Sequence, residues 1–147
     1  MAEKTTSVQI VLPQHCNGYS KPRLFGGQLM SWIDIVGAVA ARRYAQCAVT
    51  TVCVDNLNFL SAAYLNDTIV QEAIVTWTGN TSLEVRVDSF VEQLGGERAL
   101  VNRAYAVFVA LNDQDQPVQV PVFTPETDEE KAEYQAALER RRIRLGR

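Results

Sequence analysis

Asp34 is the residue in this sequence whose surroundings most demand a chemical explanation. It lies within residues 28–44, a stretch that has no proline and is apolar at most positions. A carboxylate there must be hydrogen-bonded, protonated or facing a cavity, because burying a bare charge costs much free energy. Gly37, Ala38 and Ala41 share its face of the expected helix and leave room for a substrate or another chain. A buried carboxylate held by backbone amides is the alternative.

Gly26 and Gly27 stand at the start of the same expected helix. The first N–H groups of a helix have no acceptor within it and carry the positive end of its dipole. Two glycines leave those groups open to an anionic oxygen, which is an oxyanion hole in outline. A sharp turn from loop to helix explains two glycines equally well.

The spacing of Gly27 and Asp34 indicates how they could act together. They are seven residues apart, so they share a helix face but lie roughly 10 Å apart along its axis at about 1.5 Å per residue. One carbonyl group cannot contact both. If both act on one carbon, Gly27 of one subunit must face Asp34 of another across a two-fold interface. An open sheet edge would offer a means of pairing.

Other catalytic groups are scarce. His15 is the one histidine, and Cys16, Cys47 and Cys53 form no CxxC pair, so we expect no metal site and no Cys/His catalysis. No GxSxG motif supplies a serine nucleophile. The net charge of −3 and the lack of a basic, aromatic stripe argue against nucleic acid as a partner.

Targeting signals are equally scarce. The longest apolar run, at residues 32–41, is too short to span a bilayer. The first residues have neither the basic start nor the long apolar run of a secretory signal. We therefore expect a cytoplasmic protein without a membrane span.

The patterning along the chain predicts the elements that must position these groups. With 147 residues, 47% of them apolar, we expect one domain over residues 1–147 that buries its own core. Residues 8–12 predict a strand, and residues 28–44 predict a helix that is apolar nearly all round and therefore buried on every side. Long strands are then expected at residues 50–60, 68–77, 81–93 and 97–111.

The turns and the tail complete the expected fold. Gly79-Asn80 and Gly95-Gly96 suit hairpin turns with positive φ, so consecutive strands should pair as a meander. Residues 125–144 predict a surface helix, capped at Thr124-Pro125 or by Thr127 with Glu130. The sequence therefore predicts an α+β hot-dog architecture, in which a curled antiparallel sheet of about five strands wraps a long central helix.

Four segments resemble the hot-dog acyl-CoA thioesterases of the cytosolic acyl-CoA hydrolase group. They are residues 17–41, with LFGGQLMSWIDIVGAVAA at their centre, TTVCVDNLNF at 50–59, TSLEV at 81–85 and EYQAALERRRIR at 133–144. The resemblance covers most of the chain and implies hydrolysis of a fatty acyl-CoA thioester to free acid and CoA. It implies no cofactor, because CoA is part of the substrate. It also favours at least a homodimer, and a hexamer of three dimers.

Carried over residue by residue, the resemblance implies four site residues. Asp34 matches the catalytic carboxylate, which acts as a general base on water or attacks the thioester itself. Gly27 matches the backbone donor that polarises the carbonyl, and Asn17 matches a loop amide that places substrate or water. Thr51 matches a hydroxyl that orients the carboxylate or water. A turn residue at Asn17 and an ordinary strand residue at Thr51 are the alternatives.

Some assignments stay open. The arginines near the C-terminus could contact the phosphates of CoA or complement the helix dipole, as could Arg42 and Arg43, so no CoA-binding residue is assigned. Those near the C-terminus are Arg140, Arg141, Arg142, Arg144 and Arg147. An enoyl-CoA hydratase would need an Asp beside a His in the loop before the helix, and His15 has none nearby. A non-catalytic acyl-CoA-binding module would not need Asp34.

Overall fold

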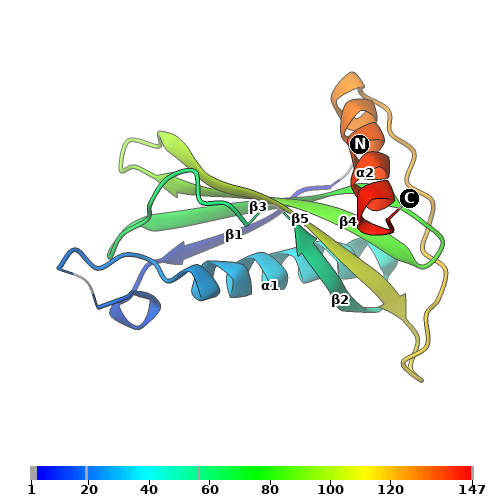
Figure 1. The fold of residues 1–147 in the computed structure, drawn as a ribbon, viewed down its shortest axis with the longest axis horizontal. Coiled ribbons are helices and arrows are strands. Elements are labelled where there is room, and N and C mark those ends of the chain that lie inside the picture. The colour runs from blue at the N-terminus through cyan, green and yellow to red at the C-terminus, as the bar shows by residue number, and fades with distance from the viewer. Residues whose placement is uncertain (1–2, 19, 56, 147) are drawn as a thin grey trace.

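The computed structural model describes residues 3–18, 20–55 and 57–146 and has the predicted α+β hot-dog architecture (Figure 1). A five-stranded antiparallel sheet curls over helix α1, and helix α2 lies on the opposite face of the sheet (Figure 1). The elements are β1 (Thr5–Ile10), a short 3₁₀ turn η1 (Pro13–His15), α1 (Gly26–Ala45), β2 (Ala48–Asp55), β3 (Thr68–Thr78), β4 (Ser82–Glu92), β5 (Arg98–Leu111) and α2 (Asp128–Arg144).

The strand order in the sheet is β1-β3-β4-β5-β2. Strands β3, β4 and β5 form the predicted meander, but the prediction that β2 pairs with β3 is wrong, because β2 pairs with β5 at the far edge. A meander needs a tight turn, and β2 already ends at Asp55, leaving a long connection before Thr68. That connection lets the chain cross from one side of the sheet to the other.

The two glycine turns differ in their physical cause. Gly96 has a φ of 93°, as predicted for a tight hairpin between β4 and β5. Gly79 has no positive φ; a Cβ there would lie 2.7 Å from the Trp77 ring, so the ring requires a glycine. At the C-terminal helix, Thr127 and Glu130 form the capping box, and α2 begins at Asp128 rather than at residue 125.

The core lies between α1 and the concave face of the sheet. Leu29, Ile33 and Val36 pack there against aliphatic side chains from β3, β4 and β5. A Cβ on Gly37 would lie 3.2 Å from Cζ of Phe108, so this glycine lets the helix lie close to the sheet.

The prediction that α1 is buried on every side is wrong within this chain. The sheet covers one side of the helix, whereas Met30 is 46% exposed and Ile35 is 58% exposed on the other. Val52 on β2 is also exposed, so the open stripe continues from the helix onto the edge strand. The sequence pattern shows that a helix face is apolar, but it does not show which chain covers it.

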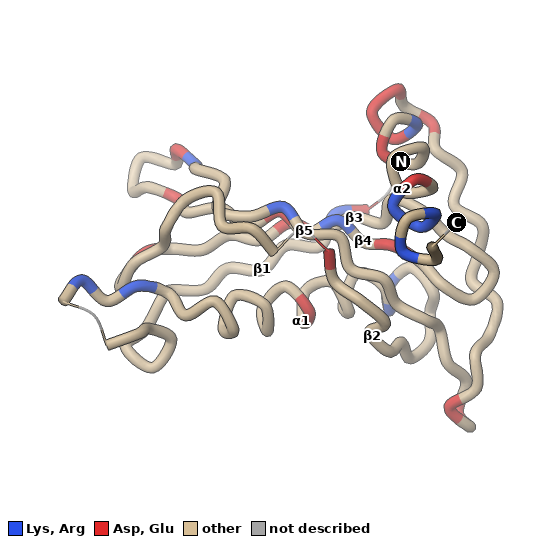
Figure 2. The backbone as a smooth tube through the Cα atoms, in the orientation of Figure 1, with Lys and Arg blue, Asp and Glu red and all other residues tan. Residues whose placement is uncertain are grey.

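Arg140 and Arg144 hold α2 against the sheet. Arg140 donates to Glu84 on β4 through Nε and Nη2, at 2.9 and 2.8 Å, and its guanidinium lies 3.5 Å from the centre of the Tyr105 ring. Arg142 pairs with Glu139 and Arg144 with Asp55, whereas Arg147 lies outside the described residues. Acidic residues gather at the start of α2 and basic residues at its end, as the helix dipole favours (Figure 2).

No helix in the described part of the chain is long and apolar enough to cross a lipid bilayer.

Candidate active site

Asp34 and Thr51 meet where helix α1 faces edge strand β2. Thr51 Oγ1 donates a hydrogen bond of 2.6 Å to Asp34 Oδ1, and the carboxylate is half-buried. Thr51 is paired with Phe108, which is fully buried in the core beneath α1. Because directly opposite residues of neighbouring strands share a face, Thr51 must also point toward α1. The register of β2 on β5 therefore brings the hydroxyl to the carboxylate.

A β-bulge next to Thr51 changes which face the rest of β2 presents. The register shifts between Thr51 and Cys53, so Val52 has no partner of its own on β5. Beyond the bulge, Asp55 lies opposite Tyr105 and reaches α2, where its carboxylate is 3.6 Å from Arg144. One inserted residue thus lets the strand face α1 at Thr51 and α2 at Asp55.

The start of α1 presents open backbone donors. Within the described chain, the N–H groups of Gly26 and Gly27 have no acceptor, and the first helical donor with one is Gln28, whose N–H bonds to Phe25 at 3.0 Å. A Cβ on Gly27 would lie 2.5 Å from Cε2 of Phe25. Glycine at this position therefore leaves the N–H open and also leaves space for the Phe25 ring.

Asn17 lies in the loop that leads to these glycines. Its backbone N–H bonds to the carbonyl of Arg23 at 2.9 Å and closes the loop. Among the residues the structure describes, no hydrogen bond joins the side chain of Asn17 to Gly27, Asp34 or Thr51. Within one chain, the predicted site is thus divided into a pair at Asp34 and Thr51 and a separate group at the helix start.

His15 is occupied by contacts within its own loop. Its Nδ1 accepts the N–H of Leu12 at 2.9 Å, and its ring packs edge-on against Trp32 with the ring centres 4.9 Å apart. The one histidine of the chain therefore has a structural role in this loop. In the described ranges, no three His, Cys, Asp or Glu residues gather as a metal site would require.

Sequence reasoning missed two aromatic residues at the start of α1. Phe25 lies against Gly27, and Phe59 lies against Gly26, where a Cβ would be 3.5 Å from its ring. Phe59 was predicted to belong to a strand, but β2 ends at Asp55. Its occurrence in one of the segments that carry the family resemblance, TTVCVDNLNF, was the available signal.

Residues 22–96 match the model of a protein family described as the Thioesterase superfamily. A Bacillus subtilis protein named "Uncharacterized acyl-CoA thioester hydrolase YkhA" is 36% identical over 145 residues, which are 98% of this chain and 83% of that protein. The chain also matches mammalian thioesterases, but it spans only 25–27% of their length.

Two solved structures are similar over almost the whole chain. One, described as an apo-hexameric acyl-CoA thioesterase, is 34% identical with a TM-score of 0.87 and covers 97% of this chain and 91% of its own. The other is an acyl-CoA hydrolase from Staphylococcus aureus in complex with butyryl-CoA, CoA and CoA disulfide, with the same identity and TM-score, covering 97% and 88%. Three further structures of that enzyme carry Ala in place of one Thr, one Asp and one Asn.

The family model spans half of the chain, and the Bacillus relative is 36% identical over nearly all of it. This chain therefore belongs to the thioesterase superfamily.

Proposed function

We propose that this chain hydrolyses acyl-CoA thioesters to a free carboxylic acid and CoA, at a site that two chains share. The observation that carries the proposal is the hydrogen bond from Thr51 to Asp34, which holds an accessible carboxylate in one orientation on an otherwise apolar helix stripe. A carboxylate fixed at Oδ1 keeps Oδ2 free for a reacting group.

The reaction needs a base or nucleophile and a group that stabilises negative charge on the carbonyl oxygen. Asp34 takes a proton from water as the water adds to the thioester carbon, or attacks that carbon itself to give an anhydride that water opens. In both routes the C–S bond breaks and the CoA sulfur leaves as a thiolate, which then takes a proton. The open N–H of Gly27 receives the carbonyl oxygen as negative charge develops on it.

The two groups come from different chains in this proposal. Seven residues along α1 place Gly27 and Asp34 roughly 10 Å apart, too far for one carbonyl. The exposed apolar stripe at Met30, Ile35 and Val52 surrounds Asp34 and adjoins the free edge of β2, where a second copy can pack. The hexameric relative supports an assembly of three such dimers.

Residue spacing in the Staphylococcus aureus enzyme supports the site assignment. Its substituted Asp and Thr are 17 positions apart, as Asp34 and Thr51 are in this chain. Its substituted Asn precedes the Asp by 15 positions, whereas Asn17 precedes Asp34 by 17, consistent with a slightly longer loop in this chain. We therefore retain Asn17 as the residue that places substrate or water. We further propose that the reaction takes place in the cytoplasm, which imaging of a fluorescent fusion would test.

Mixing two inactive variants tests the shared site. Asp34→Asn removes the base, and Gly27→Val obstructs the helix start, so each homo-oligomer should release little thiol from acyl-CoA. Co-refolding the two should restore activity, because a mixed dimer pairs one intact Gly27 with one intact Asp34. Tagged co-purification confirms that mixed oligomers form. Mixed oligomers that stay inactive would contradict the shared site, and a wild-type protein that releases no thiol from any acyl-CoA would contradict the function.

A further inference from the structure

The connection after β2 is not a strand, yet hydrogen bonds hold it against the start of β5. Asn102 Nδ2 donates to the Asn58 carbonyl at 2.8 Å, the Leu60 N–H donates to Val101 at 2.7 Å, and Ser61 Oγ donates to Leu100 at 3.1 Å. Asn102 is only 1% exposed. A buried amide is therefore used to fix one carbonyl of this connection, which is a costly arrangement for an ordinary surface loop.

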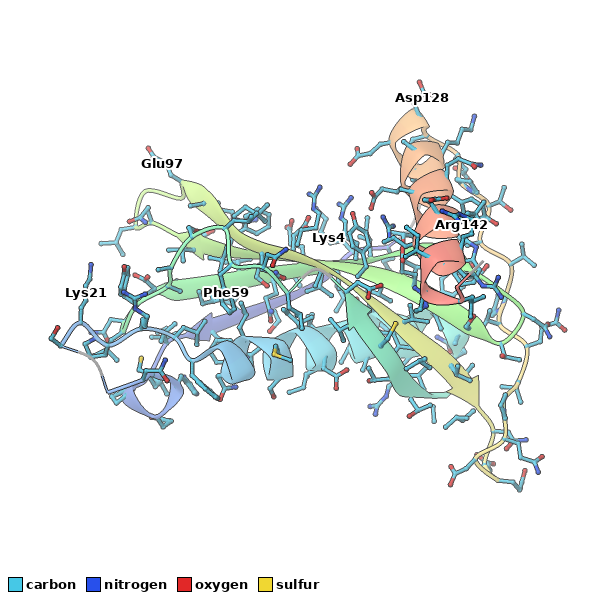
Figure 3. All side chains as sticks on the ribbon, viewed as in Figure 1. Lys4, Lys21, Phe59, Glu97, Asp128 and Arg142 are labelled. Carbon is cyan, nitrogen blue, oxygen red and sulfur yellow. The ribbon has the colours of Figure 1, made fainter. Side chains whose placement is uncertain are left out.

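These hydrogen bonds fix Phe59, which lies between the anchored residues. Its ring is 49% exposed and lies against the start of α1, with Cε2 and Cζ 3.5 Å from the position that a Cβ on Gly26 would take. Figure 3 shows the labelled Phe59 beside the first turn of the helix. The hydrogen bonds on either side of Phe59 therefore hold a half-exposed apolar ring beside the start of α1.

The ring forms one wall of a cavity of about 370 Å³. Its lining consists of Arg23, Leu24, Gly26, Phe59, Ser61, Ala62 and Ala63. The Leu24 N–H is bonded to the Ala63 carbonyl at 2.8 Å, and the Ser61 hydroxyl is bonded to Leu100. Leu24, Phe59, Ala62 and Ala63 contribute apolar side chains to the lining, whereas Arg23 and Ser61 contribute polar ones. The apolar part of this lining suits a hydrocarbon chain.

The cavity also adjoins the proposed oxyanion site, because Gly26 lines it and carries one of the two open N–H groups. We propose that this cavity receives the acyl chain of the thioester and that Phe59 limits the length of chain that fits. The proposal rests on the proposed function, since it takes the thioester carbonyl to bind at the helix start. An apolar cavity of about 150 Å³ holds a benzene ring, so this one suits acyl chains of short to medium length.

Two substitutions should move chain-length preference in opposite directions. Phe59→Ala removes one wall and should raise kcat/KM for palmitoyl-CoA relative to butyryl-CoA by about tenfold or more, since one methylene in an apolar pocket changes kcat/KM by about tenfold. Ala62→Phe fills the cavity and should lower the same ratio. Both positions are exposed enough for the variants to fold. Leu60→Ala is the matched control, because Leu60 is 64% exposed, follows Phe59 directly and does not line the cavity.

The test uses thiol release and, separately, calorimetric binding of thioether analogues of butyryl-CoA and palmitoyl-CoA. The proposal is supported if Phe59→Ala shifts both the kcat/KM ratio and the affinity ratio of palmitoyl to butyryl compounds while Leu60→Ala shifts neither. Equal losses for all chain lengths, or equal shifts in both variants, would overturn it. If the wild type binds the analogues with a preference that Phe59→Ala shifts but hydrolyses no thioester, the proposed function fails and the cavity assignment stands. Absence of both binding and turnover overturns both.

Discussion

Two carboxylates on opposite sides of the sheet differ in how completely they are paired. Glu84, facing α2, is 1% exposed and accepts hydrogen bonds from Thr76 at 2.6 Å and from both ends of the Arg140 fork. Asp34, facing away from the core on α1, is half-buried and has the single partner Thr51. The fully paired carboxylate holds a helix in place, and the incompletely paired one leaves its Oδ2 without a hydrogen bond in the described chain.

The surroundings of α2 also shift the pKa values of Arg140 and Tyr105 upward. Burial by itself lowers the pKa of Arg140, but the hydrogen bonds to Glu84, together with the charges of Glu84, Tyr105 and Glu133, raise the pKa above its ordinary value. Burial also raises the pKa of Tyr105, against which Arg140 stacks, so the phenol stays protonated at neutral pH. Arg140 and Tyr105 therefore each keep one charge state around neutral pH.

The largest effect that tests this contrast between Glu84 and Asp34 is expected at Asp34. Asp34→Asn keeps the shape but removes the base or nucleophile, so we expect kcat to fall by about 10²–10⁴. The free energy of unfolding should change by no more than about 0.5 kcal/mol, as for substitutions outside a packed core. Thiol release and urea unfolding measure the two quantities. A variant that keeps its turnover but loses stability would show that Asp34 stabilises the fold, as Glu84 does, and takes no part in the reaction.

At Glu84 we expect the reverse of Asp34, a loss of stability without a loss of activity. Glu84→Ala leaves the Arg140 guanidinium without its partner in a mostly buried site, so we expect a loss of about 3 kcal/mol in the free energy of unfolding. The double variant Glu84→Ala/Arg140→Met should recover part of this loss, because it removes the unpaired charge. Urea unfolding measures both. Activity per folded molecule should stay near that of the wild type. A fall as large as that of Asp34→Asn would contradict the purely structural role of Glu84.

Thr51 should have a smaller effect on turnover than Asp34. Thr51→Val keeps the side-chain volume and removes a hydrogen bond to a charged group, which contributes about 1.5–3 kcal/mol, so kcat should fall by about tenfold or more. Thr50→Val is the matched control, since Thr50 is the exposed neighbour and lies opposite Val109. Steady-state kinetics with acyl-CoA separate kcat from KM. Equal effects of the two variants would show that the hydroxyl of Thr51 has no special role.

The smallest effect is expected at the helix cap on the α2 side. Thr127→Ala removes the side chain that accepts the Glu130 N–H at 3.0 Å, which should cost about 1 kcal/mol of stability and leave turnover unchanged. Thr124→Ala should cost less, because the capping box is formed by Thr127 and Glu130. Thermal unfolding compares the two variants. A larger loss of stability for Thr124→Ala would show that Thr124, the other cap that the sequence allowed, is the one that stabilises the helix.

Local patterns in the sequence were sufficient for most of the fold. The apolar periodicity of residues 28–44 predicted α1, and alternation in residues 81–93 predicted β4, because burial on one face leaves a regular imprint on neighbouring positions. Contacts between residues that are far apart in the chain leave no such pattern in the sequence. Neither the pairing of β2 with β5 nor the contact of Glu84 with Arg140, 56 positions away, could be predicted from local pattern.

In the candidate site, too, the sequence predicted some features and missed those that depend on contacts between distant residues. The resemblance named Asp34 and Thr51, and the structure places them in contact, while their catalytic roles stay predictions. Asn17 and Gly27 do not meet Asp34 within one chain, and for Gly27 the spacing along the helix predicted this. Phe59 was missed because its position depends on where β2 ends and on hydrogen bonds to residues about 40 positions later.

The strand order also sets when this protein can become active during its synthesis. Strand β2 follows α1 at once, yet its only partner in the described sheet is β5, the last of these five strands to be synthesised. Until residues 98–111 are available, β2 has no neighbouring strand to fix its register, and closing the loop between β2 and β5 is slow because the loop is long. A nascent chain that already carries Asp34 therefore lacks an ordered Thr51, and the site matures only when the sheet is complete.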